Sequence, residues 1–108
     1  MSEPLILTTA DAGVATLTLN ASHSLNALSV AMLDALGAAL GDVARDPSVR
    51  AVILRGAGRA FCAGHDLKEM QAARAAPDGG RAFFADLFAR CAKVMQAIPA
   101  LPQPVIAE

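Results

Sequence analysis

The chain has 108 residues, with nine basic and ten acidic side chains that leave a formal net charge of −1. This length suits one small domain, and an apolar content of 55% excludes a disordered tail, which needs low hydrophobicity and high net charge. The sequence has no block of basic residues, so a nucleic acid is not expected as a partner.

The two cysteines and the N-terminal segment indicate the compartment. Cys62 and Cys91 are too few for a disulfide scaffold, and we expect both to be buried, unreactive thiols in a reducing compartment. The first residues lack the basic segment and the long apolar run of a signal peptide. Polar residues interrupt the uncharged stretch between Asp11 and Asp34, so no membrane span is expected. The sequence therefore predicts a cytoplasmic protein without a membrane partner.

The first elements in chain order are two strands. Residues 4–9 and 14–19 are rich in aliphatic and β-branched side chains. Gly13 lies between them and can adopt a positive φ, so the pattern predicts a β-hairpin.

A polar loop follows, and then a helix. Ser29 is a typical N-cap residue, and Pro47 disfavours helical geometry in Asp46, which predicts an end near residues 45–46. Between these limits the apolar residues recur at helical spacing: Met32, Leu33, Leu36, Leu40 and Val43.

The next segment combines a strand, a loop and a short helix. Residues 50–55 form an apolar run between two arginines, which favours a strand covered on both faces. Residues 56–64 form a loop with three glycines, and Asp66 is a suitable cap for a helix over 67–73.

The last elements are a long helix and a strand. Phe84, Leu87, Phe88, Cys91, Val94, Met95 and Ile98 mark one apolar helical face, on which the phenylalanines are expected in the core. Pro99, Pro102 and Pro104 are expected to end the helix, and a strand begins at Val105. Strands that alternate with helices predict an α/β fold with partly parallel strands.

The glycine loop is the best candidate for a ligand site. In open α/β sheets ligands bind beyond the carboxyl ends of the strands, and amides at a helix start attract negative charge. The backbone N–H groups near Gly64, His65 and Asp66 are therefore placed to hold an anion, or a carbonyl oxygen that becomes negative. The alternative is that the glycines only turn the chain.

Other chemistries fit the sequence less well. Gly56 and Gly58 follow a strand as in a dinucleotide-binding loop, but Phe61 occupies the position of the third glycine. His65 has no identifiable partner carboxylate except Asp66, whose expected role is the helix cap.

A nucleophilic or metal site is also not expected. Cys62 has no activating base that the sequence identifies, and the two histidines lack the spacing of metal ligands. Lys68 and Glu69 are expected on a solvated helix surface.

Four motifs in one order resemble the enoyl-CoA hydratase/isomerase (crotonase) superfamily, from about residue 13 onward. The similarity rests on residues 25–29 (LNALS), 49–56 (VRAVILRG), 59–70 (RAFCAGHDLKEM) and 93–107, with its lysine, prolines and final VIA. The resemblance implies a crotonase-like spiral of ββα turns, of which residues 1–108 would be an N-terminal portion that ends within the fold. It also implies trimers or hexamers, an acyl-CoA thioester as substrate, and no metal or other cofactor.

The resemblance also implies roles for particular residues. In this family two backbone N–H groups hold the thioester oxygen as it becomes an enolate, and one of them corresponds to the N–H of His65. Ala63 would lie near the adenine and Lys68 near the phosphates. The residues that correspond to contacts with coenzyme A or the acyl group are His23, Ser24, Leu25, Ala63, His65, Asp66, Leu67 and Lys68.

Two departures leave the reaction open. Ordinary hydratases often have alanine at the position of His65. The second oxyanion-hole glycine of the family and its two acidic residues correspond to positions after the strand at Val105, beyond residue 108. Hydration of a 2-enoyl-CoA is the expected reaction; isomerisation, decarboxylation and thioester hydrolysis are alternatives. A non-catalytic module that binds coenzyme A or serves in assembly is the rival hypothesis.

Overall fold

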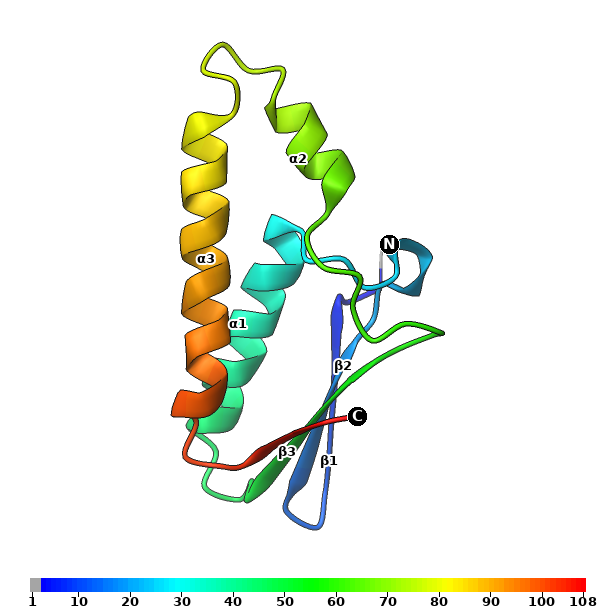
Figure 1. The fold of residues 1–108 in the computed structure, drawn as a ribbon. Helices are drawn as coiled ribbons and strands as arrows, with labels where there is room; N and C mark the ends of the chain where they lie inside the picture. The colour runs from blue at the N-terminus through cyan, green and yellow to red at the C-terminus, as the bar shows by residue number, and fades with distance from the viewer. Residues whose placement is uncertain (1–2) are drawn as a thin grey trace.

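The computed structural model describes residues 3–108, which form a four-stranded sheet with helices on one side (Figure 1). The strands are β1 (Ile6–Asp11), β2 (Val14–Leu19), β3 (Ala51–Gly56) and β4 (Val105–Ala107), in that order across the sheet. β1 is antiparallel to β2, whereas β2, β3 and β4 are mutually parallel. The predicted α/β fold with partly parallel strands is confirmed.

The hairpin between β1 and β2 has the predicted turn. Asp11 pairs with Val14, so the turn consists of Ala12 and Gly13. Both have positive φ, 53° and 84°, as a two-residue turn of type I′ requires.

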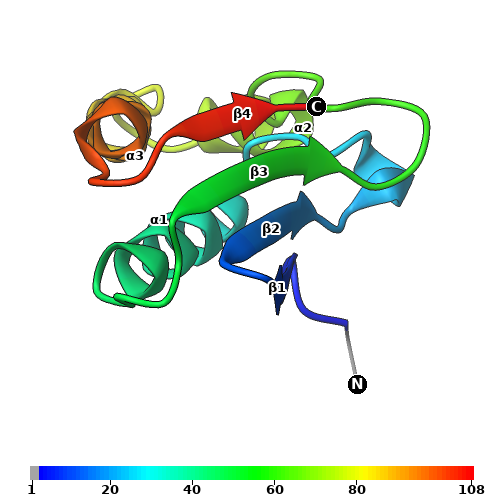
Figure 2. The same cartoon turned by 90° about the horizontal axis from the view of Figure 1, so that it is seen from below.

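Two helices connect the parallel strands. α1 (Val30–Ala44) lies between β2 and β3 in the chain, and α3 (Arg81–Ala100) lies between β3 and β4. Figure 2 shows both helices end-on, on the same side of the sheet. A short 3-10 helix (Ser22–Ser24) and α2 (Leu67–Ala73) lie in the connections that follow β2 and β3.

The helix caps agree with the sequence. The Ser29 side chain accepts a hydrogen bond from the Met32 amide, and the Asp66 side chain accepts one from the Glu69 amide. α3 differs, because it continues through Pro99 to Ala100. Proline within the last turn removes one hydrogen bond but has a helical φ, so it does not end the helix there.

The core lies between the sheet and α1 and α3. On β3, Val52 and Leu54 are buried, whereas Ala51 and Ile53 keep some exposure. The expectation that both faces of this strand are covered is therefore wrong for residues 3–108, because the helices pack on one face only. The largest fully buried apolar side chains are Leu17, Leu19, Met32, Leu33, Leu40, Val52 and Leu87.

Two further expectations need correction. Cys62 and Cys91 are free thiols, but each is only partly buried. Phe88 is predicted in the core, yet it is 50% exposed, with its ring against those of His65 and Phe84. No helix among residues 3–108 has the length and apolar character needed to cross a membrane.

Candidate active site

Asn26 holds together the two loops that follow β2 and β3. Its side chain is fully buried, and its φ of 56° is a left-handed conformation that asparagine tolerates. Oδ1 accepts a hydrogen bond from the Ala21 amide at 2.8 Å, and Nδ2 donates to the carbonyls of Ala57 and Ala60, each at 2.9 Å. One buried side chain thus fixes the path of both loops.

Two glycines in the second loop are required for different reasons. A Cβ on Gly56 would lie 2.4 Å from the carbonyl oxygen of Phe61, so the chain folds back too closely for any side chain. Gly64 has open space around it, but its φ of 92° strains any other residue. The glycines therefore shape this loop at its beginning and at its end.

His65 lies opposite Leu28 in an isolated parallel bridge. The Leu28 amide donates to the Gly64 carbonyl at 2.7 Å, and the Asp66 amide donates to the Leu28 carbonyl at 3.4 Å. In this pattern the Gly64 carbonyl and the Asp66 amide both point toward Leu28. The N–H of His65 points to the opposite side. Within residues 3–108 the His65 N–H donates no hydrogen bond, so it is free for a ligand.

A pocket of about 380 Å³ lies at these loops, which we call the loop pocket. Its lining includes all eight residues that the family resemblance assigns to substrate contact, together with Ala27. The 3-10 helix and the residues before α1 contribute one wall, and the segment that enters α2 contributes the other. Leu67 is 74% exposed there and adds apolar surface to the pocket.

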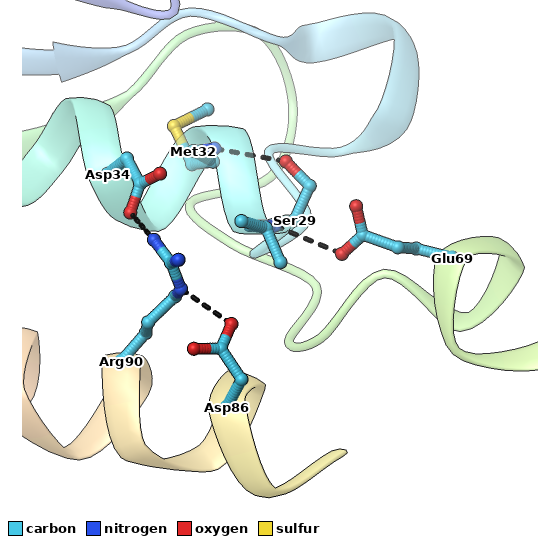
Figure 3. A network of polar contacts seen from close by, with 7 residues as sticks. Ser29, Met32, Asp34, Glu69, Asp86 and Arg90 are labelled. Atoms are coloured by element: carbon cyan, nitrogen blue, oxygen red, sulfur yellow. Dashed lines mark hydrogen bonds and ion pairs between the residues drawn. The ribbon is translucent and has the colours of Figure 1, made fainter. Parts of the chain in front are cut away.

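Glu69 has a role that the sequence did not predict. Its Oε1 accepts a hydrogen bond from the Val30 amide at 3.0 Å, beside the bond from the Met32 amide to Ser29 (Figure 3). The carboxylate of α2 thus binds the N-terminus of α1, where negative charge is favourable. The expectation of a solvated Glu69 is wrong, because the bridge at His65 brings α2 against the start of α1.

Arg90 of α3 forms ion pairs with two carboxylates, Asp86 on its own helix and Asp34 on α1. Its guanidinium donates to Asp86 at 2.7 Å and to Asp34 at 2.6 Å (Figure 3). Both hydrogen bonds raise the pKa of Arg90 above its usual value, and the bond to Asp86 is the larger cause. These half-exposed ion pairs stabilise the fold only weakly. They border a separate groove of about 440 Å³ between α1 and α3.

The His65 ring packs toward α3. It makes an edge contact with Phe88, with ring centroids 5.8 Å apart, and Phe88 stacks on Phe84 at 6.1 Å. The Nδ1 atom of His65 is buried and has no hydrogen-bond partner within residues 3–108. The residue therefore presents its amide on one side of the loop and its ring on the other.

Comparison with known families shows to which family the chain belongs. Residues 14–108 match the family described as enoyl-CoA hydratase/isomerase. The chain belongs to the enoyl-CoA hydratase/isomerase family. The resemblance inferred from the four sequence motifs is confirmed, and the architecture around His65 is that of a crotonase fold.

Relatives in this family carry several names. The chain is 41% identical to 1,2-epoxyphenylacetyl-CoA isomerase of Escherichia coli over 94% of its own length and 38% of that protein. It is 35% identical to the mitochondrial enoyl-CoA hydratase domain-containing protein 3 of Xenopus laevis over 97% of its length and 34% of that protein. The chain thus spans little more than a third of the curated relatives it matches.

A solved structure agrees closely with the fold. An enoyl-CoA hydratase of Mycobacterium smegmatis superposes with a TM-score of 0.88 and 59% identity, over 97% of this chain and 39% of that one. Among residues 3–108 of this family member, no three histidine, cysteine or carboxylate side chains are grouped as metal ligands.

Proposed function

We propose that this enoyl-CoA hydratase/isomerase family member binds an acyl-CoA thioester in the loop pocket and contributes to syn hydration of a 2-enoyl-CoA. The observation that carries the proposal is the free N–H of His65 at the rim of that pocket. A backbone N–H with no internal partner needs no rearrangement before it donates a hydrogen bond to a substrate oxygen.

The chemistry requires such a donor. Water adds its oxygen to C3 of the enoyl group, and C2 gains a proton. Between these steps the thioester oxygen carries negative charge as an enolate, and a fixed N–H stabilises that charge more than it stabilises the neutral substrate. By the family resemblance, the second donor and the acid and base correspond to positions beyond residue 108. Within residues 3–108, His65 supplies the oxyanion donor.

The remaining lining residues suit a coenzyme A thioester. Lys68 is exposed at the rim, where its ammonium can approach a phosphate, and Ala63 leaves space for a flat adenine. Leu67 offers exposed apolar surface next to the donor. The proposal includes no metal or separate cofactor, since coenzyme A is part of the substrate, and it includes a homotrimer or hexamer in the cytoplasm.

Double-bond isomerisation is the second candidate. It is supported by the family description, which names isomerases beside hydratases, and it needs the same stabilised enolate. The two reactions are separated by product analysis, since crotonyl-CoA yields 3-hydroxybutyryl-CoA by hydration, whereas a 3-enoyl-CoA yields a 2-enoyl-CoA by isomerisation.

The binding step is tested by filling the pocket in the intact protein. Ala63→Trp should weaken coenzyme A binding, measured by titration calorimetry, by at least about tenfold. Ala38→Trp is the matched control, because it places the same side chain in the groove between α1 and α3. Equal binding by both variants, or no binding by the wild type, would contradict the proposal.

A further inference from the structure

The segment that carries the His65 amide continues directly into α2, which has little anchorage in the core. None of the seven residues of α2 is buried, although the partly buried Met70 packs against the core. Among residues 3–108, the Glu69 carboxylate makes the one side-chain hydrogen bond that joins α2 to another helix or strand. This carboxylate is therefore the polar anchor of α2.

The direction of the His65 N–H is set by the hydrogen bond of the carbonyl that precedes it. The peptide group between Gly64 and His65 is planar and trans, so its N–H and C=O point in opposite directions. The carbonyl accepts from the Leu28 amide at 2.7 Å, and the Ala63 amide donates to the Leu25 carbonyl at 3.0 Å. On its N-terminal side, the peptide group of His65 is thus held by two short bonds.

On the C-terminal side of His65 the backbone is held less firmly. The bond from the Asp66 amide to the Leu28 carbonyl is 3.4 Å long and exceeds the usual range of about 2.7–3.2 Å. The bond from the Val30 amide to Glu69 joins the same two segments and is 3.0 Å long. Glu69 therefore supplies the short bond that limits tilting of the His65 peptide group on this side.

Glu69 is itself held at both ends. Its amide donates to the Asp66 side chain at 3.1 Å, and Figure 3 shows its carboxylate directed from α2 toward the start of α1. Glu69 does not line the loop pocket. A ligand in that pocket does not meet the carboxylate, so any effect of Glu69 on catalysis passes through the segment that carries His65.

We propose that Glu69 is a positioning residue for the oxyanion donor: its carboxylate keeps the His65 N–H directed at the thioester oxygen. This inference rests on the proposed function, in which that N–H stabilises the enolate. A hydrogen bond weakens steeply as its angle departs from linear, and the charge of the transition state gains most from a donor that is already fixed. Glu69 transfers no proton, and its loss should slow the chemical step while coenzyme A still binds.

The test measures kcat and KM for hydration of crotonyl-CoA, and the Kd of coenzyme A, with the intact protein. In Glu69→Ala, kcat should fall by about 10- to 100-fold, which is part of the loss that follows complete removal of a donor. KM and the Kd of coenzyme A should stay within about threefold of wild type, as for an interaction made in the transition state. Glu69→Gln keeps an oxygen for the Val30 amide and should recover most of kcat.

Asp78→Ala is the matched control for lost stability. The Asp78 carboxylate also accepts from amides at a helix start, those of Gly80 and Ala82, and it lies outside the loop pocket. This variant should keep kcat within about threefold of wild type. An unchanged kcat in Glu69→Ala, an equal loss of kcat in Asp78→Ala, or no recovery in Glu69→Gln would overturn the inference and leave the proposed function intact.

Glu69→Asp decides the matter if Glu69→Ala does not fold. It keeps the charge but is shorter by one methylene, so its carboxylate reaches the Val30 amide less well. We expect kcat to fall by about 3- to 10-fold with KM unchanged, and a wild-type kcat would overturn the inference. A wild type that neither binds coenzyme A nor hydrates crotonyl-CoA would refute the proposed function, and this inference with it.

Discussion

Replacement of the amide between Gly64 and His65 by an ester removes the N–H of His65 and leaves every side chain in place. The ester is accessible because Cys62 provides a ligation junction just upstream. If this N–H stabilises the enolate, kcat for hydration of crotonyl-CoA by the intact protein should fall by about 10²–10³-fold, or about 2.7–4 kcal/mol of transition-state stabilisation. The free energy of unfolding should fall by no more than about 1 kcal/mol, because the N–H makes no hydrogen bond within residues 3–108 and the ester only weakens the Gly64 carbonyl as the acceptor for the Leu28 amide.

A second ester at Asp66 separates catalysis from stability. It removes the hydrogen bond from the Asp66 amide to the Leu28 carbonyl, at 3.4 Å, but no proposed oxyanion donor. This variant should lose about 0.5–1.5 kcal/mol of stability and keep most of its kcat. If the His65 ester retains kcat within about threefold of wild type, or if both esters lose kcat equally, the assigned role of the His65 amide is wrong.

Three further substitutions test the scaffold of the site, each by urea unfolding of the intact protein. Asn26→Ala leaves buried partners without hydrogen bonds and should cost at least about 2 kcal/mol; a loss below about 0.5 kcal/mol would show that the loops do not depend on it. Glu69→Ala removes the acceptor for the Val30 amide and should cost about 0.5–2 kcal/mol of stability, with a smaller loss in Glu69→Gln. Equal stability of the wild type, Glu69→Ala and Glu69→Gln would contradict that contact. Hydrogen bonds from the Ala82 and Gly80 amides lower the pKa of Asp78, so its contribution to stability is present above the usual pKa of an aspartate, about 3.9, and is lost as the pH falls through the lowered value. Stability should therefore decline more steeply below about pH 4 in wild type than in Asp78→Asn, and identical slopes would contradict this.

The elements of the fold were predictable because their signals are local. Ser29 and Asp66 mark helix starts by bonding to an amide three residues away, and Gly13 marks the hairpin by its own φ. Such interactions are encoded within a few residues, so the sequence shows them directly.

The position of the site required tertiary information. Asn26 contacts Ala57 and Ala60, and Glu69 contacts Val30, across separations of 31, 34 and 39 residues. A sequence pattern can indicate that a buried asparagine suits a left-handed turn, but it does not indicate the partner. The one-sided burial of β3 was missed for the same reason, because it depends on where α1 and α3 pack.

The residues that line the loop pocket were predicted from the family resemblance and not from the spacing of apolar residues. His23, Ser24 and Leu25 precede α1, whereas the other proposed contacts follow β3. Parallel pairing of β2 with β3 places the ends of both strands at one edge of the sheet, which explains why two distant segments line one pocket.

In the proposed function, the His65 amide holds the thioester oxygen in the loop pocket. The most direct test is a crystal structure of the intact protein with acetoacetyl-CoA, a stable thioester that resembles the enolate. We expect the thioester oxygen about 3 Å from the His65 nitrogen, with the coenzyme along Ala63 and Lys68. A thioester bound elsewhere, or an occupied loop pocket in which the His65 N–H contacts no substrate oxygen, would contradict it.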